Sequence, residues 1–421
     1  MDLSLQILLF FALLIVLAKC FGDLAARFGF PVVLGELLVG LILGPTFINI
    51  FHNFSPGSMA EGGAPTLPGI AKILANLGGV VLMFLAGLET DIVMMRKAVG
   101  PAFWSACGGV IVPLAGGALV SRAAGFGWTE SIFIGTILTA TSVSITAQTL
   151  LNMNELRSRA GSTILGAAVI DDVLGLVILS FVTASAAGKH AGALHESAGV
   201  LPVLGRVTGF LVLGLLLGPP LIRAIFKRAS LLQGPHSRTA IAFAVAMSFA
   251  FLAEFLGGMA AITGAYLAGY LIAANCHDEE MLRDIRSLTH TFFAPVFLVS
   301  IGLAINARTA GAQIGFFLIV LAVAVAGKVV GSGLGAWASG FEWRESLVVG
   351  VGMVPRGEVG LITASLGWSA GIISTSVYSL MVVLVLVTTL ITPVMLRMVH
   401  PWENPVHAGV LEIGPEVDTT G

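Results

Sequence analysis

Apolar residues form long, nearly unbroken runs along this chain, and short polar segments separate one run from the next. An apolar run of about 20 residues is long enough to cross the roughly 30 Å hydrocarbon layer of a bilayer as an α-helix. The pattern therefore predicts about thirteen membrane-spanning helices. The expected spans are 3–19, 30–46, 69–88, 99–121, 130–151, 159–186, 199–224, 238–256, 258–275, 288–306, 313–337, 345–366 and 374–397.

The composition agrees with this pattern. Of 421 residues, 57% are hydrophobic and 10% are charged, and the mean hydropathy is +0.98, whereas soluble domains contain roughly 25% charged residues. The formal net charge of -2 gives no sign of a nucleic-acid partner. The cysteines at positions 20, 107 and 276 lack metal or redox spacing. We expect an all-α polytopic protein whose surroundings are the lipid bilayer.

Cationic residues are distributed unevenly between the two sets of loops. About fourteen Lys and Arg residues follow odd-numbered spans, whereas the opposite loops hold Arg122, Lys189 and Arg308. Cytoplasmic loops of membrane proteins carry the excess of Lys and Arg. The distribution predicts an N-terminus outside the cell and a C-terminus in the cytoplasm.

The order of the spans suggests an internal repeat. Six spans, one connecting helix and six further spans would place the second set in the membrane with inverted topology, as in several secondary transporters. Span 130–151 then corresponds to span 345–366. The first contains Thr141 and Ser142 in a polar stretch, and the second contains Pro355-Arg356-Gly357-Glu358. Paired interrupted helices indicate a binding site near the midplane, although small and hydroxyl residues also serve close helix packing.

Three charged residues lie deep within otherwise apolar spans. Asp171 and Asp172 are adjacent in span 159–186, and Lys328 lies in span 313–337, all near mid-depth at 1.5 Å per residue. A carboxylate at that depth costs at least about 2.5 kcal/mol on insertion scales, so each is a functional hypothesis. Adjacent helical side chains point about 100° apart. We therefore predict that Asp171 pairs with Lys328, and that Asp172 faces an aqueous cavity as the principal cation ligand.

Such a carboxylate can bind either a proton or a cation, and this competition is sufficient for exchange. The Asp171 and Lys328 pair has a second interpretation, a buried salt bridge that only fixes helix packing. Arg356 and Glu358 also lie near mid-depth and predict a polar network, with either a structural or a direct transport role.

Two other functional classes also use acids inside a membrane. In an intramembrane aspartyl protease, two acids share a proton and must converge from separate helices, which neighbours on one helix cannot do. A gated cation channel can line its filter with acids, but Lys328 beside them would repel the permeating ion. The residues favour an exchanger, and a potassium/proton exchanger stays open beside a sodium/proton exchanger.

Four segments together resemble the NapA-type bacterial sodium/proton antiporters of the monovalent cation:proton antiporter superfamily. They are Ala140-Thr141-Ser142-Val143, residues 166–176 around the paired aspartates, Gly327-Lys328 and residues 355–362. The resemblance implies an NhaA/NapA-like fold of inverted six-helix repeats with crossed discontinuous helices, in a bacterial inner membrane. The implied cargo is sodium or lithium and protons, without a cofactor. The residues assigned to ion binding are Asp172, Asp171, Lys328, Thr141 and Ser142, and Arg356 and Glu358 form the core polar network.

The same resemblance implies a homodimer that works by an elevator-like shift of a core domain. The implied domains are dimerisation segments 1–88 and 238–306, core transport segments 99–186 and 313–397, a linker helix 199–224 and a cytoplasmic tail 398–421. Members with two acids are typically electrogenic and exchange two protons for one sodium. The Asp-Asp pair and the short tail favour sodium, because potassium-efflux relatives often have Gln-Asp and a large C-terminal nucleotide-binding domain.

Overall fold

The computed structural model of this chain describes residues 3–28, 30–51, 66–187, 200–229, 231, 234–276, 278–303 and 314–399. Within these ranges the regular secondary structure is entirely helical, without a β-strand. The helices are α1 (Leu3–Arg27), α2 (Val32–Leu43), α4 (Leu67–Leu88), α5 (Ile92–Ala123), α6 (Trp128–Thr139), α7 (Val143–Asn152), α8 (Arg159–Ala187), α9 (Val200–Ala229), α10 (Ser237–Phe255), α11 (Ala261–Asn275), α12 (Glu279–Leu288), η1 (Thr289–Phe293), α13 (Ala294–Leu303), α14 (Ile314–Ala338), α15 (Trp343–Gly352), α16 (Glu358–Ser369) and α17 (Thr375–Val399).

The described part of the chain contains 10 helical segments that are long and apolar enough to cross a membrane. The chain is therefore an all-helical, multi-pass membrane protein. The three expected spans outside these ten segments consist of shorter helices: α2 with 12 residues, α11 with 15, and α15 and α16 with 10 and 12. A helix of this length falls short of the roughly 30 Å hydrocarbon layer. The expected span count and the inverted repeat stay predictions.

Two expected spans are interrupted. Span 130–151 consists of α6 and α7 with a break at residues 140–142, and span 345–366 consists of α15 and α16 with a break at residues 353–357. The second break contains Pro355 and Gly357, and proline and glycine are poor residues for a helix interior because proline lacks an N–H and glycine is conformationally free.

One expected span begins earlier than the apolar pattern indicated. Instead of starting at residue 288, the helical segment runs from Glu279 through α12, the π-helical η1 and α13 to Leu303. The first turns of α12 are charged and strongly amphipathic. A search for apolar runs does not detect such a beginning, because the helix is polar where it leaves the membrane.

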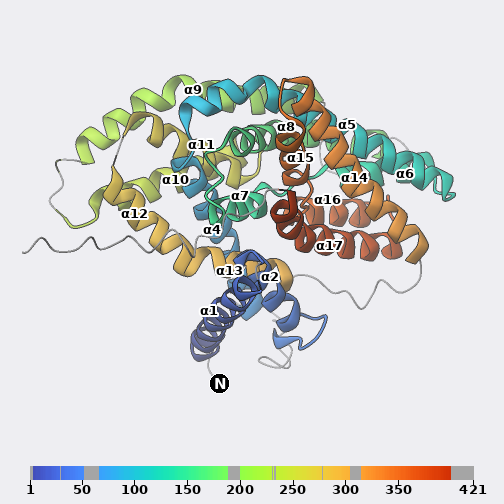
Figure 1. Ribbon diagram of the computed structural model, residues 1–421, viewed down its shortest axis with the longest axis horizontal. Coiled ribbons are helices and arrows are strands. Elements are labelled where there is room, and N and C mark those ends of the chain that lie inside the picture. The colour runs from blue at the N-terminus through green and yellow to red at the C-terminus, as the bar shows by residue number, and fades with distance from the viewer. Residues whose placement is uncertain are drawn as a thin grey trace, which may run out of the picture.

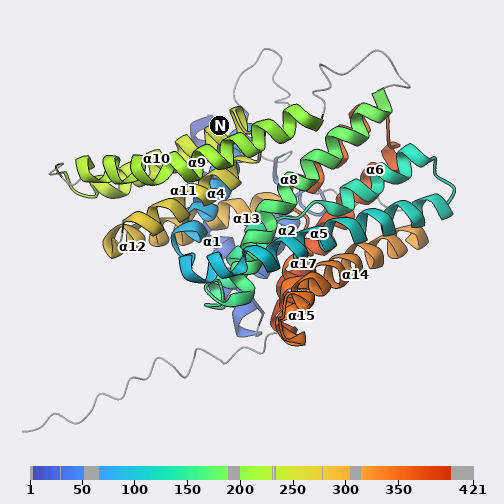
Figure 2. The same cartoon turned by 90° about the horizontal axis from the view of Figure 1, so that it is seen from above.

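The helices form two packed groups. In the first group, α5 packs along α6, α8 and α14, and α14 packs on α15. In the second group, α4 packs along α11 and α13, and α2 packs on α1 and α13. Helices α10, α11 and α12 lie at the left in two perpendicular views, whereas α6, α14 and α17 lie at the right (Figures 1 and 2). We use "first group" for α5 to α8 with α14 to α17, and "second group" for α1, α2, α4 and α10 to α13.

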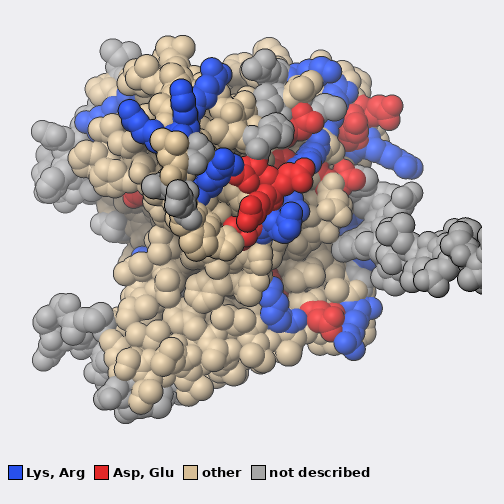
Figure 3. Space-filling model, turned by 90° about the vertical axis from the view of Figure 1, so that its left-hand side faces the viewer, with Lys and Arg blue, Asp and Glu red and all other residues tan. Residues whose placement is uncertain are grey.

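Much of the outer surface is apolar. Figure 3 shows that the charged side chains on the left-hand side of the molecule gather in limited regions and leave a broad uncharged area. Exposed leucines follow one another on α9, at positions 213, 215, 216, 217 and 221. Contiguous apolar patches of this kind are rare on proteins surrounded by water. This surface fits contact with lipid chains or with another membrane-embedded protein.

Glycines allow α5 and α14 to pack closely in the first group. Gly108 and Gly331 face each other, and a Cβ atom on either residue would overlap the carbonyl oxygen of the other. Small residues let helix backbones approach each other inside a membrane. The position of α14, and therefore of Lys328 on it, depends on this crossing.

Gly108→Ala is expected to destabilise the protein by about 1–3 kcal/mol, because the added methyl group overpacks this crossing. The measurement is the thermal unfolding midpoint of the purified protein in detergent. Gly100→Ala is the matched control on the same helix, since a Cβ atom there meets nothing within 4 Å. The control should be neutral or slightly stabilising because alanine has the higher helix propensity. Equal midpoints for the two variants would show that the crossing relaxes at no cost.

Candidate functional site

The breaks in the two interrupted helices lie directly against each other. The backbone N–H of Ser142 donates to the carbonyl oxygen of Pro355 at 2.7 Å. Thr146 of α7 donates its hydroxyl to the carbonyl oxygen of Gly352, at the end of α15, at 2.6 Å. Helix ends have backbone groups without a partner in their own helix, and these must be satisfied where no water is present. Polar groups of one break thus hydrogen-bond to backbone groups of the other, and the two breaks form one polar junction.

The two predicted hydroxyl residues lie at this junction and are buried. The hydroxyl of Thr141 donates to the carbonyl oxygen of Met353 at 3.4 Å. The hydroxyls of Ser142 and Ser144 lie 3.2 Å apart. The described bonds of both predicted residues therefore connect polar groups within the junction, and their part in ion binding stays a prediction.

Arg356 carries a buried positive charge into the junction. Its Nη1 atom donates to the carbonyl oxygens of Leu138 and Ala140, and its Nη2 atom donates to that of Ala324 at 2.9 Å. Because α6 ends at Thr139, its last carbonyls lack helical partners and form the negative end of the helix dipole. The guanidinium compensates that end and connects α6 to α14.

Of the polar network predicted around Arg356 and Glu358, the structure therefore describes the hydrogen bonds of Arg356. Glu358 is the first residue of α16, and its side chain lies outside the described part of the structure. Asp171 also interacts electrostatically with Arg356. Beside Lys328, Arg356 is thus a second buried cation in the region of Asp171.

Asp171 and Lys328 form a buried ion pair between α8 and α14. The Nζ atom of Lys328 donates to Oδ1 of Asp171 at 3.0 Å, and the two side chains are 0% and 3% exposed. Removing one partner from such a pair leaves an uncompensated charge, which is far more costly than the pair itself. The pair therefore couples the positions of the two helices.

Asp172 points in a different direction and is only partly buried. Its Oδ2 atom accepts a hydrogen bond of 2.6 Å from the hydroxyl of Thr263 on α11. A rotation of about 100° between neighbouring helical residues separates the two carboxylates in this way. Asp171 is thus directed into the first group, and Asp172 is directed to the second.

Thr263 is a site residue that the sequence did not predict, and so is Thr146 at the junction. A single threonine in an apolar helix is usually a packing residue, so its residue type gave no signal. Depth was the available signal: Asp172 lies thirteen residues after Arg159, the start of α8, and Thr263 lies twelve residues before Asn275, the end of α11. At 1.5 Å per residue these distances are about 20 and 18 Å.

Comparisons with known proteins agree on one family. Residues 10–401 match the family described as sodium/hydrogen exchanger, transmembrane. The Na(+)/H(+)-K(+) antiporter GerN of Bacillus cereus is 35% identical over 386 residues, which cover 92% of this chain and 94% of that protein. The Na(+)/H(+) antiporter of Enterococcus hirae is 34% identical over 388 residues, covering 91% and 96%.

A solved structure has the same fold. The sodium proton antiporter MjNhaP1 from Methanocaldococcus jannaschii superposes with a TM-score of 0.72 at 18% sequence identity, covering 99% of this chain and 100% of that one. At this identity the similarity concerns the fold alone. The NapA-type class and the NhaA/NapA-like fold expected from the motifs stay predictions beside it.

Proposed function

This chain belongs to the sodium/hydrogen exchanger family, and from that premise we propose that it exchanges sodium or lithium for protons through Asp172. One observation carries the proposal. Lys328 donates a hydrogen bond of 3.0 Å to Asp171, whereas the adjacent Asp172 is partly buried and accepts a hydrogen bond from the neutral hydroxyl of Thr263 on another helix. We therefore assign the binding of a proton or a cation, in turn, to Asp172. Antiporters of this family are transporters, not enzymes.

We propose an electrogenic cycle in which two protons exchange for one sodium, with Lys328 as the carrier of the second proton. Each cycle would then move one net charge across the membrane. The membrane potential acts on such a charge with about 2.3 kcal/mol per 100 mV. The adjacent acids Asp171 and Asp172 support this assignment, since one acid can serve the cation while the other holds the lysine.

Alternating access would occur by an elevator-like movement of segments 99–186 and 313–397 against segments 1–88 and 238–306, with 199–224 as the linker. The packing of the first group on itself supports a body that moves as one unit. We further propose a homodimer in a bacterial plasma membrane, with the N-terminus outside and the C-terminus in the cytoplasm. The uneven distribution of Lys and Arg between the loops supports this orientation.

A potassium/proton antiporter is the second candidate, because the name of GerN includes potassium. The test is dissipation of an imposed pH gradient by the purified protein in liposomes after addition of sodium, lithium or potassium. We expect sodium and lithium to dissipate the gradient, and protein-free liposomes to show no response. A response to potassium alone would favour the second candidate, and no response to any of the three cations would refute exchange.

A further inference from the structure

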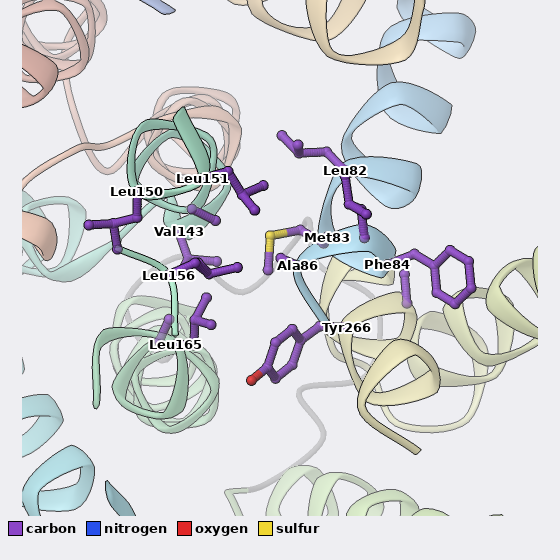
Figure 4. Close-up of a cluster of buried hydrophobic side chains, with 14 of the residues drawn as sticks. Leu82, Met83, Phe84, Ala86, Val143, Leu150, Leu151, Leu156, Leu165 and Tyr266 are labelled. Carbon is purple, nitrogen blue, oxygen red and sulfur yellow. The ribbon is translucent and has the colours of Figure 1, made fainter. Parts of the chain in front are cut away.

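The boundary between the first group and the second group is apolar beside the site. Figure 4 shows side chains of α7 and α8 on one side and of α4 and α11 on the other. All of these side chains are buried: Leu82, Met83 and Ala86 of α4, Val143, Leu150 and Leu151 of α7, Leu156 before α8, Leu165 of α8, and Tyr266 of α11. Apolar contact is not directional. These apolar contacts can slide past one another without the loss of a directional bond.

Thr263 departs from this pattern because it makes a directional bond across the boundary. It lies on α11 three residues before Tyr266, whose side chain points toward α8 in Figure 4. Its side chain is 5% exposed, and its hydroxyl lies 2.6 Å from Oδ2 of Asp172. A hydrogen bond to a carboxylate is shorter and stronger than one between neutral groups. The two proposed moving parts are therefore bonded at the proposed ion-binding carboxylate itself.

The direction of this hydrogen bond determines how its strength responds to ion binding at Asp172. The hydroxyl donates and Asp172 accepts, so the bond is strongest when the carboxylate is ionised and carries no other ligand. A proton or an alkali cation on Asp172 neutralises the negative charge that strengthens the bond. Binding of either ion therefore weakens the connection to α11.

We propose that Thr263 is a positioning residue that holds the empty, ionised Asp172 against α11 and releases it when an ion binds. The inference rests on the proposed function and adds a reason for tight coupling. An exchanger loses its gradient if the empty carrier crosses the membrane. A bond that is strongest in the empty state, and that connects the two parts which must separate, opposes that leak.

Among the described residues, two other hydrogen bonds cross the same boundary without touching the carboxylates. Arg157, in the loop before α8, donates to the backbone oxygen of Glu89 at 3.0 Å. Gln148 of α7 and His290 of η1 lie 3.3 Å apart through Nε2 and Nδ1. These bonds must break in every movement, whatever Asp172 carries. They affect the rate of movement, whereas the strength of the Thr263 bond depends on whether Asp172 carries an ion.

The test compares Thr263→Val, which removes the hydroxyl and keeps the shape, with Thr263→Ser, which keeps the hydroxyl. In proteoliposomes the valine variant should lower the KM for sodium about tenfold, because a bond that competes with the cation is lost. It should also release preloaded sodium into sodium-free medium of high pH several times faster than wild type, since this net efflux requires the empty carrier to return. The serine variant should match wild type in both measurements.

Gln148→Met is the control, because it removes a hydrogen bond across the same boundary whose strength does not depend on the ion bound to Asp172. It should change the maximal rate without changing the KM for sodium. A raised KM in Thr263→Val would overturn the proposal and make the hydroxyl a cation ligand, and an unchanged KM and efflux would overturn it as well. If the valine variant does not fold, Thr263→Ala gives the same comparison. Exchange by wild type together with unchanged threonine variants refutes this inference alone, whereas absence of exchange in wild type refutes the proposed function.

Discussion

Asp172→Asn is expected to lose sodium-dependent proton exchange, with a rate at least about a hundredfold below wild type. Asparagine has the shape of aspartate, and its amide oxygen can still accept the hydroxyl of Thr263. It has no negative charge for a cation and no exchangeable acid proton. A loss of about 3 kcal/mol in ion binding corresponds to about a hundredfold in affinity. The measurement is dissipation of an imposed pH gradient in proteoliposomes after addition of sodium.

The matched control is Asp23→Asn on α1. Asp23 forms an ion pair with Arg27 at 2.8 Å, and its side chain is 62% exposed. The same chemical change at this position should leave exchange unaffected, because exposed ion pairs contribute little. An unchanged thermal unfolding midpoint of Asp172→Asn would show that the variant is folded. Normal exchange by the folded Asp172→Asn variant would exclude Asp172 as the ion-binding residue.

Lys328→Gln is expected to destabilise the protein by about 3–5 kcal/mol, because it leaves the carboxylate of Asp171 buried without its partner. The thermal unfolding midpoint in detergent measures this effect. The double variant Asp171→Asn with Lys328→Gln should recover part of the loss, since neither charge then remains in the interior. Lys72→Gln is the control at an exposed lysine on α4 and should leave the midpoint within about 0.5 kcal/mol of wild type.

The same lysine variant tests the origin of electrogenicity. If Lys328 carries the second proton, the exchange rate of Lys328→Gln should not respond to an imposed membrane potential. The exchange rate of wild type should rise or fall with the sign of the potential. The potential is set by a potassium gradient with valinomycin, and sodium-driven proton movement is recorded at each value. A response equal to that of wild type would remove Lys328 from the proton pathway and leave it as a structural partner of Asp171.

Local chemistry explains why part of the site was predictable. The length of each apolar run indicated a helical membrane protein without reference to any contact. The rotation between adjacent helical residues was sufficient to direct Asp171 and Asp172 to different partners, and the lysine at equal depth identified one of them. Pro355 and Gly357 together indicated an interrupted helix, whereas single prolines such as Pro113 of α5 and Pro393 of α17 lie within continuous helices.

Contacts between segments far apart in the chain were decided by the tertiary structure. Arg356 binds carbonyl oxygens more than two hundred residues earlier in the chain. The sequence of its own span does not indicate which carbonyl oxygens a buried arginine will bind. The charged start of α12 has a local signal that a search for apolar runs does not use, since Asp278 caps the helix by accepting a hydrogen bond from the N–H of Met281 at 3.0 Å.

The sequence by itself thus determined a helical membrane protein with two adjacent carboxylates directed to different partners, because helix geometry and the cost of a charge in lipid act within a single segment. The identity of the partner of Asp172 required the fold. A threonine in an apolar helix has no distinctive pattern, and only the fold, in which α11 packs on α4, α9 and α10, brings the hydroxyl of Thr263 to within 2.6 Å of the carboxylate.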